Sequence, residues 1–228
     1  MSAWHELVER DHDLQNPTSA EKLRLVGEHL RLGPESRVLD VACGKGGPAL
    51  VLAQAFGCRI HGVEVSETFA AEARRRIAEA GMEQLVDVEL ADASRVALEP
   101  GSFDTALCIG AAFVWGHVGD AVAALLPALA PGGGIAIGEP FWRQPRRKGD
   151  DFVDLLSTVE RFEQGGVDLI GLVAASEDDW DRYRSLQWRA AVETGDDEVR
   201  AQSFAYRENY LSRQRAELGW AIFVGRKR

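Results

Sequence analysis

The chain has 228 residues, of which 46% are hydrophobic and 27% charged, so it is long enough to bury the core of one globular domain. Its net charge of −10 repels phosphate backbones and anionic membranes, which argues against nucleic acid and membrane partners. The 3 cysteines lack CxxC spacing, and no segment has the pattern of a signal peptide or membrane-spanning helix. We therefore expect a soluble cytoplasmic protein without a metal.

Helical and apolar segments alternate through the first part of the chain. Thr18, with Glu21 three residues later, forms a capping-box signature for a helix whose apolar face is Leu23, Val26 and Leu30. The elements expected next are strand 38–41, helix 47–56, strand 60–65, helix 67–80, strand 86–90, strand 105–109, helix 121–129 and strand 134–137. This order predicts a parallel sheet with right-handed crossovers and helices on both faces.

After these elements the pattern loosens. The expected elements are a helix at about 151–162, an apolar run at 167–173, charged helices at about 177–193 and 196–217, and a strand at 220–224. We expect residues 36–228 to form one domain. Residues 1–35 form a helical arm or lid in this interpretation, and about 176–218 form a helical insertion.

The turn after the first expected strand, DVACGKG at residues 40–46, raises the question of which ligand it holds. A Walker A loop is excluded, because Leu39 stands where that motif has its first glycine and Gly46 where it has Ser or Thr. The dinucleotide fingerprint G-x-G-x-x-G/A does fit, with Ala49 as its last residue and Glu64 placed to bind ribose hydroxyls. An NAD-dependent oxidoreductase therefore stays open.

The same turn resembles that of the class I S-adenosylmethionine (SAM) dependent methyltransferases, whose first strand ends in acid-x-small-x-G-x-G. GVEVS at residues 62–66 is similar to the family's second-strand element with its ribose-binding acid, and ADA at 91–93 resembles the adenine-edge element. Residues 102–113 and 126–142 resemble the fourth strand, the next helix and the fifth strand. The resemblance covers about residues 36–142 strongly and the final segment moderately.

This resemblance implies a Rossmann-like, doubly wound sheet of seven strands in an α/β/α sandwich, mostly parallel with an antiparallel last strand. It also implies SAM as the cofactor of a SAM-binding domain. A carboxylate suits the ammonium and ribose hydroxyls of SAM, and glycines let the backbone approach the ligand. The residues expected at SAM are Asp40, Ala42, Gly44, Gly46, Glu64, Val65, Asp92, Ala93 and Cys108. A helix cap, a strand-end salt bridge and a turn former remain the structural alternatives for the three acids.

The reaction implied is methyl transfer to an O, N, S or C nucleophile of a small molecule, with release of S-adenosylhomocysteine. The amino-group methylases of nucleic acid carry an Asn/Asp-Pro-Pro-aromatic element after the fourth strand, where this chain reads IGAAF at residues 109–113. That difference and the negative charge favour a small-molecule acceptor. A non-catalytic SAM-binding module is a further alternative, and the oligomeric state stays open.

Two residues are candidates for proton transfer. His117, just beyond the fourth strand, is a candidate general base, because an imidazole takes up a proton near neutral pH; alternatively, it begins a helix and bonds the backbone. Glu139, at the end of the fifth strand, either faces the pocket or bonds a neighbouring loop. His12, Asp13 and Asn16 precede the first helix, where the family often has a lid.

Aromatic and basic residues suggest where an acceptor binds. The candidates for an aromatic substrate wall are Trp115, Trp142, Tyr206 and Tyr210, although aromatic residues at helical spacing are also typical of a core. A basic run either attracts an anionic group of the acceptor or is a solvated loop; it consists of Arg143, Arg146, Arg147 and Lys148.

Overall fold

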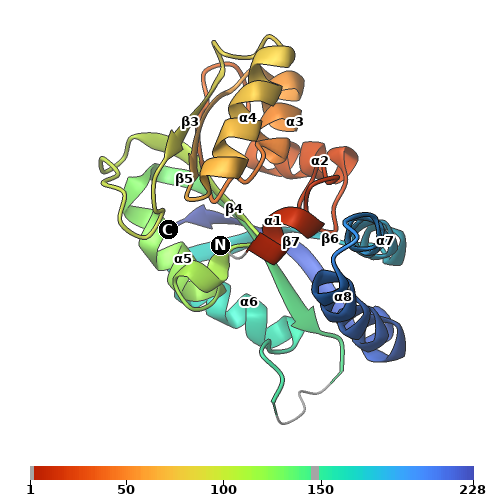
Figure 1. Ribbon diagram of the computed structural model, residues 1–228. Coiled ribbons are helices and arrows are strands. Elements are labelled where there is room, and N and C mark those ends of the chain that lie inside the picture. Colours follow the sequence, from red (N-terminus) through yellow and green to blue (C-terminus); the bar gives the residue numbers. More distant parts are fainter. Residues whose placement is uncertain (1–2, 145–148) are drawn as a thin grey trace.

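The computed structural model describes residues 3–144 and 149–228 and has a seven-stranded sheet at its centre (Figure 1). The strand order is β3-β2-β1-β4-β5-β7-β6. Neighbours from β3 to β5 pair in parallel, and β7 is antiparallel to both β5 and β6. The strands are β1 (Arg37–Val41), β2 (Arg59–Glu64), β3 (Val86–Leu90), β4 (Phe103–Ile109), β5 (Leu129–Trp142), β6 (Val167–Ala174) and β7 (Leu218–Lys227). The predicted fold class, including the antiparallel last strand, is confirmed.

Helices cover both faces of this sheet (Figure 1). The α-helices are α1 (Ala3–Val8), α2 (Ala20–Leu30), α3 (Gly47–Phe56), α4 (Glu67–Glu79), α5 (Val118–Leu125), α6 (Leu155–Gln164), α7 (Glu177–Glu193), α8 (Asp197–Asn209) and α9 (Arg215–Glu217). Short helical turns are η1 (Ala112–Val114), η2 (Leu126–Ala128) and the π-helical η3 (Tyr210–Gln214). The helices α2, α3 and α4 lie on one face, α5 and α6 lie on the other, and α7 and α8 lie beside the β6 edge.

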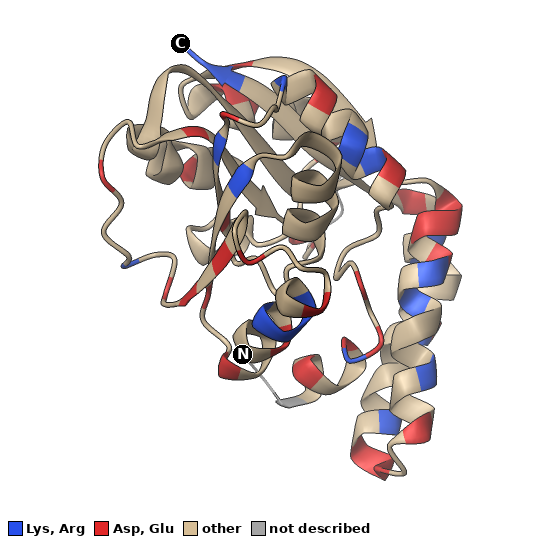
Figure 2. Ribbon diagram, turned by 90° about the horizontal axis from the view of Figure 1, so that it is seen from above, with Lys and Arg blue, Asp and Glu red and all other residues tan. Residues whose placement is uncertain are grey.

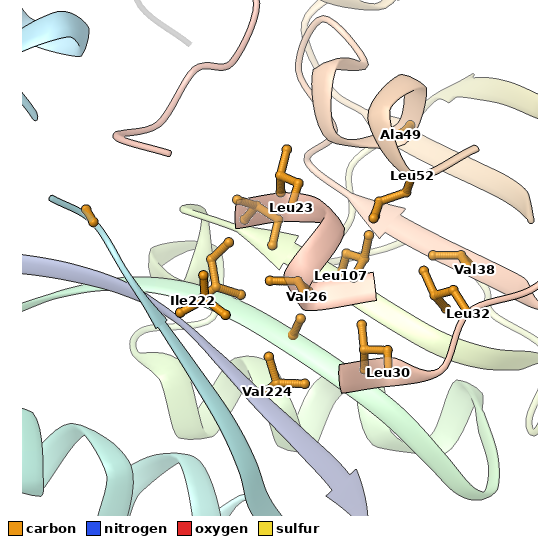
Figure 3. Close-up of a cluster of buried hydrophobic side chains, with 14 of the residues drawn as sticks. Leu23, Val26, Leu30, Leu32, Val38, Ala49, Leu52, Leu107, Ile222 and Val224 are labelled. Atoms are coloured by element: carbon orange, nitrogen blue, oxygen red, sulfur yellow. The ribbon is translucent and has the colours of Figure 1, made fainter. Parts of the chain in front are cut away.

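The core on the α2 and α3 face is built from branched aliphatic side chains (Figure 3). Leu23 and Val26 of α2 pack with Leu52 of α3 and with Ile222 and Val224 of β7. Strands of a parallel sheet are buried on both faces, and successive side chains point to opposite faces. Along β4, Leu107 and Ile109 therefore belong to this core, whereas Cys108 belongs to the core beneath α5 and α6.

Capping residues fix the helix boundaries and change two expected starts. Ser19, not Thr18, caps α2, since the Ser19 hydroxyl accepts a hydrogen bond from the Lys22 amide. His117 caps α5, which therefore begins at Val118 rather than at residue 121. The helix expected at 196–217 is divided by the π-helical turn η3.

The N-terminal 35 residues do two different things. Helix α2 packs into the core. We call residues 9–18 the cover segment. Together with α1, the cover segment extends from α7 to the glycine turn. The Tyr183 hydroxyl of α7 donates to the Glu9 carboxylate at 2.9 Å, and the Lys45 ammonium of the turn donates to the Glu9 carbonyl at 2.9 Å. Within the described residues, no helix has the length and apolar character needed to cross a membrane.

Candidate functional site

The glycine turn begins where β1 ends, and it has an unusual backbone. Ala42, Gly44 and Gly46 have φ angles of 52°, 57° and 72°. Glycine adopts these left-handed conformations without cost, but an L-residue with a Cβ loses about 1–2 kcal/mol there. The surrounding structure holds Ala42 in this strained conformation, as is common at binding sites.

Glu64 ties the end of β2 to this turn. Its side chain is buried; Oε2 accepts a hydrogen bond from the Gly44 amide and Oε1 accepts one from the Ser66 amide, each at 2.8 Å. A carboxylate accepts about four hydrogen bonds, so lone pairs remain for the hydroxyl groups of a ligand. The residue thus shapes the turn and offers negative charge at the same place.

Asp40, the acid that begins the motif, is also buried. Its Oδ2 atom has no hydrogen-bond partner in the described part of the chain. Burial, and then the nearby charge of Glu64, raises the pKa of Asp40 to about 8, so that the carboxyl group is mostly neutral at pH 7. A cation placed beside it would favour the charged form, which makes the position suitable for an ammonium group.

A cavity of about 550 Å³ lies at the carboxyl ends of β1, β2 and β4. Ligands of open α/β sheets bind at this edge of the sheet, and pockets of this size hold small molecules. A second cavity, of about 30 Å³, contains Asp40 and shares Gly44, Asn16 and Ile109 with the large one. The two cavities form one site that extends from Asp40 past Glu64.

The cover segment lies against this site at positions where glycine leaves room. Gln15 Oε1 accepts from the Lys45 amide at 2.8 Å, and a Cβ on Gly44 would lie 2.1 Å from that oxygen. Asn16 Nδ2 donates to the Ile109 carbonyl at 2.7 Å, and a Cβ on Gly110 would lie 2.0 Å from Asn16 Oδ1. The glycines therefore admit the cover segment as well as a ligand.

Comparison with known proteins identifies the family. Residues 38–133 match a family model described as a methyltransferase domain. A crystal structure of a SAM-dependent methyltransferase from Geobacter sulfurreducens, in complex with S-adenosyl-L-homocysteine, superposes with a TM-score of 0.91; it is 32% identical and the match covers 100% of this chain and 99% of that one. The chain is a class I SAM-dependent methyltransferase.

Two further relatives extend the comparison. The uncharacterized protein YjhP of Escherichia coli (strain K12) is 32% identical, over 96% of this methyltransferase and 95% of YjhP. The 27-O-demethylrifamycin SV methyltransferase of Amycolatopsis mediterranei (strain S699) is 28% identical, over 72% of this chain and 58% of that protein.

SAM is the cofactor of the methyltransferase, and three features of the site fit it. The unpartnered buried carboxyl of Asp40 suits the ammonium group, the remaining lone pairs of Glu64 suit the ribose hydroxyls, and Gly44 exposes backbone without a Cβ. Val65, expected at SAM, also lines the large cavity and is 56% exposed.

Other expected cofactor contacts lie outside this cavity. The Asp92 carboxylate accepts from the amide and hydroxyl of Ser94, and Ala93 lines a separate depression. The adenine contacts of these two residues stay predictions. Cys108 is completely buried beneath α5, and the adjacent Ile109 lines the large cavity; the expected SAM contact of Cys108 stays a prediction.

Neither proton-transfer candidate lines the large cavity. His117 begins a helix, the alternative left open above: its Nδ1 accepts from the Gly119 amide at 3.2 Å and the Asp120 amide at 3.4 Å. Glu139 lies in a separate cavity of about 50 Å³, where burial, opposed by the charge of Arg161, raises its pKa to about 7. The proton-transfer roles of His117 and Glu139, which both line this smaller cavity, stay predictions; the imidazole on the wall of the large cavity is that of His5, which sequence reasoning missed.

Of the four aromatic candidates, Tyr206 lines the large cavity. Tyr210 is buried and its hydroxyl donates to Asp181, while Trp142 is buried under the Arg213 guanidinium. Trp115 lines the depression that also contains Ala93. These three residues do not line the large cavity, so their substrate contacts stay predictions; a regular aromatic spacing does not distinguish a core from a pocket.

The remaining sequence-based expectations concern the basic run and the binding of a metal ion. Arg143 is exposed, and Arg146, Arg147 and Lys148 lie outside the described residues. Between residues 3 and 144 and between 149 and 228, no group of three His, Cys, Asp or Glu side chains is arranged to hold a metal ion.

Proposed function

We propose that this methyltransferase transfers a methyl group from SAM to a small molecule and releases S-adenosylhomocysteine. The observation that supports the proposal is a single cavity of about 550 Å³ that continues from Glu64 and Val65 to an aromatic wall containing Tyr206. The net charge of −10 disfavours nucleic acid. The relative from Amycolatopsis mediterranei, which is named for 27-O-demethylrifamycin SV, is consistent with a small-molecule acceptor.

In this proposal the chain mainly binds and orients the reactants. When bound, SAM supplies a methyl group on a sulfonium, which needs no further activation by the protein. Asp40 holds the ammonium end and Glu64 holds the ribose. Gln15 and Asn16, hydrogen-bonded to the Lys45 amide and the Ile109 carbonyl, exclude water from the turn.

The proposed domain organisation follows the same contacts. Residues 36–228 are the SAM-binding domain, and the helices between β6 and β7 are its insertion. Within residues 1–35, the lid consists of α1 and the cover segment. This lid must move for SAM to enter, because its side chains lie on Gly44 and Gly110.

Calorimetric titration tests the cofactor site. We expect the protein to bind SAM and S-adenosylhomocysteine but not NAD, and Glu64→Gln to weaken SAM binding by about 10–100-fold, because it removes charge-assisted hydrogen bonds worth about 1.5–3 kcal/mol. Glu67→Gln, on the exposed first turn of α4, is the matched control. Binding of NAD without SAM, or unchanged SAM affinity in Glu64→Gln, would contradict the proposal. Turnover in an acceptor screen separates the enzyme from a binding module.

A further inference from the structure

Three elements build the end of the cavity that lies away from the glycine turn. Trp4 and His5 come from α1, Phe113 from η1, and Tyr206 from α8. The Trp4 and Tyr206 ring centroids are 5.2 Å apart with an interplanar angle of 43°. Phe113 and Tyr206 are 75% and 51% exposed, so this end presents aromatic surface that a ligand would cover.

The charge of the cavity wall restricts what binds there. Among its described lining residues there is no lysine or arginine, and Glu64 is the one carboxylate. An acceptor carboxylate or phosphate would lose hydration without gaining a lysine or arginine partner from the wall, and burying a charge that no side chain pairs is unfavourable. The wall therefore favours an uncharged acceptor.

Several described side chains of this wall carry groups that exchange protons, among them those of Glu64, Tyr183 and His5. Two amides already bond the Glu64 carboxylate. Tyr183 also lines the cavity, but its hydroxyl donates to Glu9, and burial with the charge of Glu9 raises the pKa of Tyr183 above its usual range. His5 is the imidazole on this wall, with its ring centroid 6.1 Å from that of Phe69. An imidazole nitrogen that carries no hydrogen atom can accept a proton.

We propose that the acceptor is an uncharged aromatic compound with a hydroxyl group, bound against Trp4 and Tyr206, and that His5 accepts the hydroxyl proton. The acceptor oxygen forms a bond to the methyl carbon as the carbon–sulfur bond breaks, and the electron pair of that bond stays on sulfur. The hydroxyl proton passes to a ring nitrogen of His5. This inference rests on the proposed function and specifies its acceptor.

Binding of two matched probes tests the acceptor class without turnover. Calorimetry on protein saturated with S-adenosylhomocysteine compares 2-naphthol with 6-hydroxy-2-naphthoate, which adds a carboxylate. We expect 2-naphthol to bind at least 10-fold more tightly. We also expect Tyr206→Ala to weaken 2-naphthol binding about 10-fold, while Tyr206→Phe and the affinity for S-adenosylhomocysteine stay near wild type.

Equal or tighter binding of the carboxylate, or unchanged 2-naphthol affinity in Tyr206→Ala, would overturn the acceptor class while leaving the proposed function intact. If the wild-type protein does not bind S-adenosylhomocysteine, the proposed function is wrong, and this inference is wrong with it.

Turnover tests the role of His5. In a screen for S-adenosylhomocysteine release, we expect uncharged phenols and naphthols to be acceptors, and hydroxybenzoates and aliphatic amines to be poor. His5→Gln should lower kcat about 100-fold with little change in KM, while His29→Gln in α2 leaves both unchanged. Unchanged kcat in His5→Gln, or S-adenosylhomocysteine release with amines or carboxylates only, would refute the inference.

Discussion

Asp40 combines a structural cost with a binding role. Its pKa of about 8 in the folded chain lies above the value of 3.8 for an unperturbed aspartate, so between these values the folded state holds a proton that the unfolded state has lost. The stability contributed by the neutral carboxyl is therefore fully present below about pH 4 and is lost as pH rises toward 8. An ammonium group beside Asp40 reverses this loss, which couples SAM binding to proton release.

Replacing Asp40 by asparagine removes this titration. We expect Asp40→Asn to raise the Tm above that of wild type, and to raise it more at pH 8 than at pH 5. The difference in the free energy of unfolding is about 2 kcal/mol, which corresponds to roughly 4–8 °C in Tm. We expect the SAM affinity of this variant to fall at least 10-fold. Thermal unfolding at both pH values and calorimetry measure the two effects. Asp197→Asn, on the exposed first turn of α8, is the control. Equal gains at pH 5 and pH 8 would contradict the assigned burial cost.

Sequence reasoning found the residues whose position follows from strand ends. Asp40 and Glu64 end adjacent parallel strands, so their proximity follows from the order of elements alone. The position of Cys108 depended on side-chain alternation in β4, and that of Tyr210 depended on how α7 and η3 pack. His117 was ambiguous because its role depends on backbone geometry, which no residue pattern specifies.

At the scale of elements, the lid is held by contacts to distant parts of the chain. A Cβ on Gly47, the first residue of α3, would lie 2.1 Å from the Asp13 carbonyl of the cover segment. The sheet and most helices were predictable from local periodicity, whereas the placement of α1 was not, since α1 packs against α7 and its Glu6 carboxylate accepts hydrogen bonds from the hydroxyls of Ser66 and Thr68 at the start of α4. Non-local packing of this kind leaves little trace in a local pattern.

Gly47→Ala tests whether this contact seats the lid. Alanine improves helix propensity by about 1 kcal/mol, but the added methyl group must displace the backbone of Asp13, a conflict that costs about 1–3 kcal/mol. We expect faster hydrogen exchange across residues 9–18 and no gain in Tm. Gly33→Ala, where a Cβ meets nothing within 4 Å, should leave the exchange of this segment unchanged. A Gly47→Ala protein with a higher Tm and wild-type exchange would disprove the contact.

Across the whole molecule, acidic and basic residues are interspersed along α7 and α8 (Figure 2). Each of these helices begins with acidic residues, which the helix dipole favours. The excess of 36 acidic over 26 basic residues gives an acidic protein overall. The long-range field therefore disfavours polyanions, and selection of the acceptor falls to the walls of the cavity.

A buried polar network connects the lid, α7 and the glycine turn. The Glu9 carboxylate accepts from Tyr183 and Gln187, and the Lys45 ammonium donates to the Glu9 and Arg10 carbonyls. Glu9 is completely buried, so breaking this network leaves an uncompensated charge. Closure of the lid over a ligand and stability of the whole fold are therefore linked.

This linkage has a measurable consequence for thermal unfolding. S-adenosylhomocysteine at 100 times its Kd should stabilise the fold by about 2.7 kcal/mol, which corresponds to a rise in Tm of about 5–10 °C for a domain of this size, whereas NAD at the same concentration should cause no shift.

Tyr183→Phe removes one donor to Glu9 and loosens the lid. At the same ligand concentration, the stabilisation of this variant by the ligand should be smaller than that of wild type by about 1 kcal/mol. Leu211→Ala, at an exposed site outside the cavity, should be stabilised as much as wild type. An equal shift in Tyr183→Phe would show that ligand binding does not depend on lid closure, because only a ligand that favours the closed state gains from the Glu9 network.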